Sequence, residues 1–144
     1  VINRGEPACF LTHWPGMYAN GTGVAFRTFR GTVQQLNRGF ADRIRWMKLT
    51  EIARYWAAKE LTAISHDDGA VQLKAPFATP GFTMEMPLRL GKLVTTHAGV
   101  ESPFEQVRAM QQLRAGTYLD RNAAGCSVVC FDLKKGITRV ARRV

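Results

Sequence analysis

From about Thr62 to the end, the chain consists of short alternating runs separated by turn residues, and this pattern restricts the fold most. The runs are AVQLKA (70–75), FTMEMP (82–87), KLVTT (92–96), SVVCFDL (127–133) and ITRVAR (137–142). Apolar residues at every second position, bounded by Gly, Pro and Asp, are typical of antiparallel strands that bury one face. The spacing predicts a mainly antiparallel, β-sandwich-like domain over residues 62–144.

Residues 102–116 (SPFEQVRAMQQLRAG) do not fit the alternating pattern. Ser102 can cap a helix, Pro103 suits the first helical position, and Gly116 lies where a helix would end. Four apolar residues fall at helical steps between them: Phe104, Val107, Met110 and Leu113. We therefore predict a helix over residues 103–115, with a strand as the alternative.

The first 61 residues begin with a predicted strand and a predicted helix. ACFLTH (8–13) has the composition of a short buried strand, and Pro15 and Gly16 then break regular structure. Apolar residues at steps of three and four predict a helix that ends near Gly39, with a stripe facing a core. The stripe consists of Phe26, Phe29, Val33, Leu36 and Phe40.

A second strand and a second helix follow within the same 61 residues. Residues 43–47 (RIRWM) alternate like a strand. Thr50 can cap a helix, and Glu51 in its first turn suits the helix dipole. The apolar face of this helix is predicted to comprise Leu49, Ile52, Ala53 and Trp56.

The two halves together predict an α+β fold. A partial α/β segment (strand–helix–strand–helix) occupies residues 1–61, and the β-sandwich-like domain occupies residues 62–144. Two strands are too few for a complete parallel sheet, so either they join the second half or residues 1–61 close a larger α/β domain. The first residue is Val1 rather than methionine, which favours the larger domain.

Composition and charge fit a folded protein with a basic surface. Hydrophobic residues make up 46% and charged residues 22%, and no apolar run approaches the ~20 residues of a membrane span. The net charge of +9 is spread along the chain, as on a solvated surface, but it would also favour anionic polysaccharide, nucleic acid or lipid headgroups. Zinc-finger spacing and aromatic RNA-binding motifs are absent from the sequence, so nucleic acid is the less favoured partner.

The three cysteines, Cys9, Cys126 and Cys130, form no CxxC motif. On one strand Cys126 and Cys130 would share a face about 13 Å apart, which is too far for a disulfide. We expect buried free thiols, which leave the cellular compartment open.

His13, at the end of the first predicted strand, is the main candidate for a catalytic residue. In α/β folds, reactive groups collect beyond the C-terminal ends of strands, and histidine suits acid–base work because it titrates near neutrality. Trp14, Tyr18 and Asn20 follow it and are candidate substrate-binding residues, since aromatic rings stack on sugar faces. The alternative is that His13 bonds the loop backbone at a strand end while the aromatic residues only pack.

The remaining motifs favour structural roles. His66-Asp67-Asp68-Gly69 has ligand-like composition, but Asp-Asp-Gly between strands is ordinary hairpin-turn chemistry. Gly21-Thr22-Gly23 lacks the spacing of a phosphate-binding loop, and no Gly-x-Ser-x-Gly nucleophile motif occurs. We predict no metal or cofactor site within this chain.

Residues 8–60 resemble the end of the catalytic domain of the polysaccharide deacetylases, carbohydrate esterases with a distorted (β/α) barrel. That domain closes with a strand running into a Leu-x-His motif, a loop and helix, a short strand and a last helix. Leu11-Thr12-His13 is similar to the motif, and IRWM (44–47) and TEIARYW (50–56) follow in the expected order. Trp14 departs from the family, which usually has Asp after the histidine.

The resemblance implies a function for the whole protein. His13 would protonate the leaving group as the acetyl group departs, and Trp14 would line the substrate groove. The paired aspartates and histidines that hold the divalent metal of the family lie upstream of this segment, so the chain alone would be inactive. The partners would be a polysaccharide and the rest of the catalytic domain, and the location secreted or periplasmic. The alternatives are a non-enzymatic glycan- or protein-binding α+β module and a basic nucleic-acid-binding domain.

Overall fold

The computed structural model describes residues 2–4, 6–67, 69–87, 92–121 and 125–143. The chain divides into two compact units, Val1–Ile52 and Ala53–Val144. The division lies within helix α3 (Leu49–Leu61), earlier than the boundary at residue 61 that the sequence pattern suggests.

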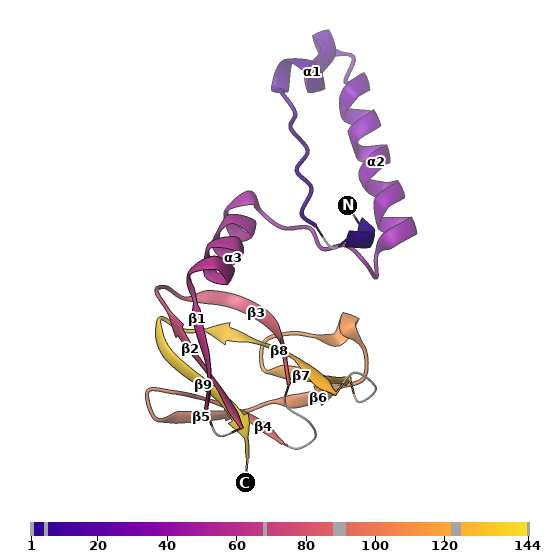
Figure 1. The fold of residues 1–144 in the computed structure, drawn as a ribbon. Helices are drawn as coiled ribbons and strands as arrows, with labels where there is room; N and C mark the ends of the chain where they lie inside the picture. The colour runs from indigo at the N-terminus through magenta and orange to yellow at the C-terminus, as the bar shows by residue number, and fades with distance from the viewer. Residues whose placement is uncertain (1, 5, 68, 88–91, 122–124, 144) are drawn as a thin grey trace. The chain divides into compact units, whose positions relative to one another are not determined.

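The second unit contains two mostly antiparallel sheets, and this confirms the α+β fold with a β-rich domain (Figure 1). Its described strands are β1 (Ala63–Asp67), β2 (Ala70–Ala75), β3 (Thr79–Met86), β4 (Leu93–His97), β5 (Val100–Pro103), β6 (Glu105–Val107), β7 (Thr117–Arg121), β8 (Cys126–Leu133) and β9 (Gly136–Arg142). One sheet has the order β1-β2-β9-β4-β5, and the other has the order β3-β8-β7-β6, with β6 and β7 parallel. The five alternating runs coincide with β2, β3, β4, β8 and β9.

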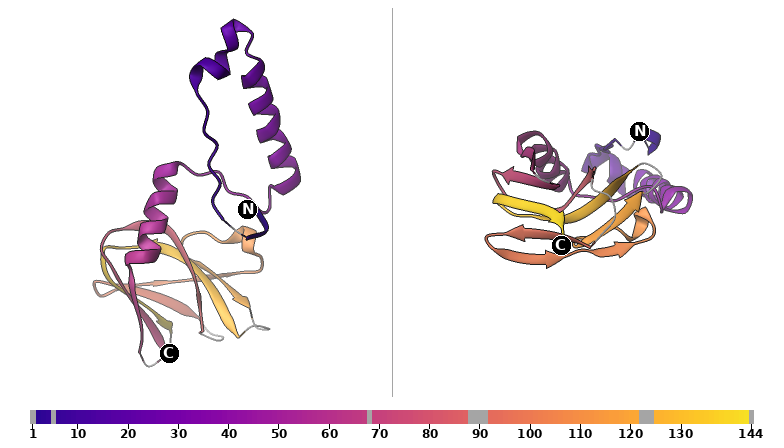
Figure 2. Two further views of the ribbon diagram at one scale, coloured as in Figure 1. Left: turned by 45° about the horizontal axis from the view of Figure 1, so that its top comes forward. Right: turned by 60° about the horizontal axis from the view of Figure 1, so that its bottom comes forward.

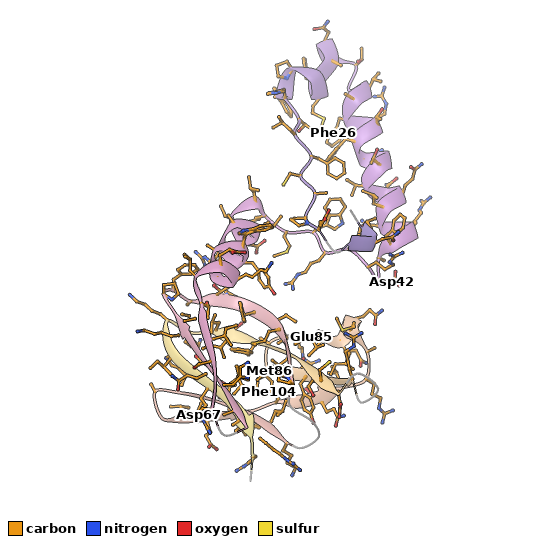
Figure 3. The ribbon with its side chains drawn as sticks, in the orientation of Figure 1. Phe26, Asp42, Asp67, Glu85, Met86 and Phe104 are labelled. Atoms are coloured by element: carbon orange, nitrogen blue, oxygen red, sulfur yellow. The ribbon has the colours of Figure 1, made fainter. Side chains whose placement is uncertain are left out.

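The hydrophobic core of this unit lies between the two sheets, whose strands Figure 2 shows from two further directions. Leu73 from β2, Leu133 from β8 and Val140 from β9 are almost completely buried. The Phe131 ring packs edge-on against the rings of Phe82 and Phe104, with 6.0 Å between centroids in each pair. Aromatic pairs in this geometry add to the stabilisation from burial alone. Figure 3 shows Phe104 among the side chains that fill the interior.

The predicted helix over residues 103–115 is wrong, and the strand alternative is closer to the structure. The chain passes from β5 in one sheet to β6 in the other at Phe104, whose N–H donates to the Leu93 carbonyl at 2.9 Å. A short 3-10 helix, η3 (Met110–Gln112), follows. Phe104 and Val107 are both buried, because the chain crosses from one sheet to the other between β5 and β6. The two buried residues are therefore three positions apart, which is the same spacing that a helix would produce.

Helix α3 confirms the second predicted helix but packs through a different face. The Tyr55 hydroxyl donates to the Thr83 carbonyl of β3 at 2.9 Å, and Ala58 is buried in the core. The predicted face is the wrong one, because Leu49, Ala53 and Trp56 are exposed and Ile52 is half-buried. At 100° per residue, Leu49 and Trp56 lie on the side of the helix away from Ala58. One apolar face of α3 is therefore covered by the sheets and the other is uncovered.

The first unit contains η1 (Ile2–Arg4), α1 (Trp14–Tyr18), η2 (Ala19–Gly21) and α2 (Val24–Phe40). Helix α2 confirms the predicted helix through Phe40. The two predicted strands are wrong, since residues 8–13 and 43–47 belong to no strand, although residues 8–13 run extended (Figure 1). A strand requires the backbone groups of a neighbour, and none is paired with these segments in the part of the unit that the structure describes.

The structure contains no disulfide among its three cysteines. All three cysteines are free; Cys130 is buried as predicted, Cys126 is half-buried, and Cys9 is exposed against expectation. Cys9 is exposed because the segment around it is not covered by a sheet. No described helix has both the length and the apolar character required to cross a bilayer.

Candidate functional site

His13 lies where the extended segment meets α1. Its backbone is extended (φ −114°, ψ 141°), and its carbonyl accepts the Met17 N–H at 3.1 Å, so the residue caps the helix through its main chain. The His13 side chain is exposed and has no hydrogen-bond or ion-pair partner among the described residues. The hypothesis that its ring bonds the loop backbone is not met, and the imidazole is accessible to a ligand.

Trp14 and Tyr18 form an exposed aromatic pair immediately after His13. Their rings are stacked with 6.4 Å between centroids and 19° between planes. Trp14 is 75% exposed and Tyr18 57% exposed, so the pair does not serve as core. Residues four apart lie on the same side of a helix, which explains the contact. The pair presents flat apolar area with polar edges, as a sugar-stacking surface requires.

Asn20 belongs to a tight loop that holds this pair in place. Asn20 has left-handed backbone angles (φ 52°, ψ 37°), which asparagine tolerates better than most residues. The Gly23 N–H donates to the Tyr18 carbonyl at 3.1 Å, and the Thr22 hydroxyl donates to the Ala19 carbonyl at 2.8 Å. The left-handed backbone at position 20 by itself accounts for an asparagine there. The Asn20 side chain is exposed, so contact with a ligand would be a second role of this residue.

Arg27 supports the same loop and was not singled out from the sequence. Its guanidinium donates to the Thr22 carbonyl at 2.7 Å and lies beside Gly23. Gly23 has a positive φ of 60° at the N-terminus of α2. The sequence offers one signal for the contact between Arg27 and Thr22. Arg27 lies one turn into a helix that begins directly after a glycine-containing loop.

The two histidines of the β unit, His66 and His97, do not lie together. His66 is exposed on β1, and the Nδ1 atom of His97 on β4 is 2.9 Å from the Ile137 carbonyl. Strands β2 and β9 separate β1 from β4 in the sheet. The turn after His66 is a hairpin turn, as predicted, with Asp67 paired to Ala70. Asp68 lies outside the described residues.

The divalent metal implied by the resemblance does not fit the residues that the structure describes. They bring together no group of three or more His, Cys, Asp or Glu side chains that could hold an ion.

The unit that carries His13 has no buried side chain among its described residues. The stripe of α2 is only partly covered: Phe29, Val33, Leu36 and Phe40 are half-buried, and Phe26 is 51% exposed. Figure 3 shows Phe26 pointing from α2 towards the extended segment. Phe10 and Leu11 in that segment are 58% and 86% exposed. Apolar area on this scale is a signature of an interface.

Comparison with protein-family models, with curated proteins and with solved structures finds no match to this chain. The site is therefore interpreted from its own residues.

A second feature of interest lies in the β unit, where the sequence pattern indicated a helix. Residues 105–114 surround a surface hollow of about 570 Å³. No motif in the sequence marks this hollow, because it depends on how the chain turns after β6.

Proposed function

We propose that residues 1–61 are the closing part of a polysaccharide deacetylase-like catalytic domain, and that the chain is the C-terminal part of a carbohydrate-active hydrolase. Residues 62–144 would be a β-rich accessory domain. One observation carries the proposal: the His13 unit has an amphipathic helix and an extended apolar segment, yet no described side chain in it is buried. Such a unit fits a piece of a larger core better than a complete domain.

The extended segment supports this interpretation. Apolar side chains of Phe10 and Leu11 precede His13, whose backbone already has strand angles. Neighbouring barrel strands would supply backbone partners for residues 8–13 and cover these side chains. His13 would then stand at the C-terminal end of a strand, where barrel enzymes place catalytic groups.

The uncovered face of α3 supports it independently. Tyr55 and Ala58 already attach the helix to the β unit, so the exposed Leu49 and Trp56 are not needed there. Lys59 lies over the Trp56 ring, with its Nζ atom 5.6 Å from the centroid, and this contact shields only part of the indole. As the last helix of a barrel, α3 would bury this second face against the preceding strands and join the two domains.

The residues of the chain suit one step of deacetylation. Hydrolysis of a sugar acetyl ester releases acetate, and the departing sugar oxygen must gain a proton. The His13 imidazolium would donate that proton as general acid. Trp14 and Tyr18 would stack on the sugar ring beside it. The divalent metal would be held by residues outside this chain, and the protein would act outside the cytoplasm on a polysaccharide.

The proposal is tested on the longest gene product that contains these residues. The reading frame upstream should encode an Asp-Asp pair and a His-x3-His pair. The purified product should release acetate from an acetylated polysaccharide, while the 144-residue chain should not. A product that contains the upstream sequence but lacks those motifs and releases no acetate would refute the proposal.

A non-enzymatic binding module is the second candidate. The exposed, stacked Trp14 and Tyr18 rings favour it, because they form a binding surface without any other polypeptide. This candidate leads if the 144-residue chain binds glycans and the longer product releases no acetate.

A further inference from the structure

The hollow at residues 105–114 lies on the β unit, outside the site around His13. It is formed where the chain leaves β6, turns through η3 and returns towards β7, and its volume of about 570 Å³ is in the range of sites for small ligands. Apolar side chains of Val107 and Leu113 contribute to its lining together with six polar residues. The polar residues are Glu105, Gln106, Arg108, Gln111, Gln112 and Arg114.

Two of the three glutamines accept a hydrogen bond from the protein at their carbonyl oxygens. The Gln112 Oε1 atom accepts the Arg108 N–H at 3.0 Å, and the Gln106 Oε1 atom accepts the Tyr118 hydroxyl at 3.3 Å. Burial, and then the negative charge of Asp120, raise the pKa of the Tyr118 phenol, so the hydroxyl stays protonated and can donate. Each of these oxygens accepts one hydrogen bond, so Gln106 and Gln112 can offer a ligand their NH₂ donors as well as the remaining lone pair of the oxygen.

The charged side chains that line the hollow favour an anionic ligand. Arg114 pairs with Glu105 at 2.6 Å and so neutralises its carboxylate. Arg108 is exposed, and its guanidinium has no ion-pair partner in the part of the chain that the structure describes. The charged side chains that line the hollow therefore leave one net positive charge, which lies on Arg108. A ligand that complements this charge is an anion.

We propose that this hollow binds the carboxylate of an acidic saccharide, with Arg108 as the main contact and the amides of Gln106 and Gln112 as additional donors. The guanidinium fork matches the two oxygens of a carboxylate. The choice of a saccharide as the carrier of the carboxylate rests on the proposed function. The accessory domain would then hold an acidic polysaccharide while the catalytic domain acts on it.

The test titrates the 144-residue chain with trigalacturonate, with its fully methyl-esterified form and with a sulfated trisaccharide. Binding is followed by calorimetry and by the amide signals of Arg108 and Gln112. Trigalacturonate should bind and shift these signals, and the esterified form, in which each carboxylate has become a neutral methyl ester, should not. Arg108→Ala should weaken binding about tenfold or more, as expected for a lost charge-assisted contact.

Arg139→Ala is the matched control, since Arg139 is an exposed arginine of β9 in the other sheet and its loss changes the net charge equally. It should leave affinity nearly unchanged, with both variants keeping the unfolding temperature of the parent chain. Equal weakening by the two substitutions, binding of the esterified form, preference for the sulfated ligand or no binding at all would each overturn the inference. Acetate release by the longer product is measured separately, so this inference and the proposed function can fail independently.

Discussion

His13→Ala, in a gene product that contains the complete catalytic domain, is expected to lower the rate of acetate release by about 10²–10⁴-fold, the usual contribution of a general acid. The sugar oxygen would then have to leave without a proton donor beside it. Because the His13 side chain is exposed and unpaired among the described residues, the free energy of unfolding should change by less than about 0.5 kcal/mol.

His66→Ala is the matched control for this substitution. His66 is also exposed, but it lies on β1 and outside the site around His13. The control should keep full activity. Unchanged acetate release in the His13 variant, or an equal loss in both variants, would exclude a catalytic role for His13.

Phe131→Ala in the 144-residue chain should lower the free energy of unfolding of the β unit by about 3–5 kcal/mol. Phe131 is 3% exposed and contacts Phe82 and Phe104, so the substitution leaves a cavity and removes two edge-on ring contacts. Chemical denaturation, monitored by the far-ultraviolet signal of the sheets, measures the change.

Ile137→Ala in β9 serves as the control, because Ile137 is 52% exposed. It should change the free energy of unfolding by less than about 0.5 kcal/mol. A loss of similar size in the two variants would mean that the core does not lie between the two sheets.

The β unit could be predicted because its strands pair within the chain. Leu73 lies between the polar residues Gln72 and Lys74, and the sheets that bury its side chain are both present. Local pattern and tertiary structure agree at β2, β3, β4, β8 and β9, so the alternating runs coincide with these strands.

The errors have two physical causes. At Phe104 and Val107, a crossing between sheets produced the same spacing as a helix, and spacing alone cannot distinguish these arrangements. At residues 8–13, the apolar composition favoured a buried strand, but these residues are exposed and no strand is paired with them among the described residues.

The residues of the candidate site were proposed from the sequence, whereas their geometry was not. Trp14 and Tyr18 do lie together, because helical spacing brings them into contact. The hollow at Arg108 could not be anticipated, since it depends on how the chain turns after β6.

The central claim is that residues 8–13 form a barrel strand whose neighbouring strands lie elsewhere in the longer gene product. Its most direct test is amide hydrogen exchange, measured in the 144-residue chain and in that longer product. In the 144-residue chain these amides should exchange at nearly unprotected rates, because the segment is exposed and forms no strand. In the longer product that contains the rest of the catalytic domain they should be strongly protected. Equally fast exchange in both chains would contradict the claim.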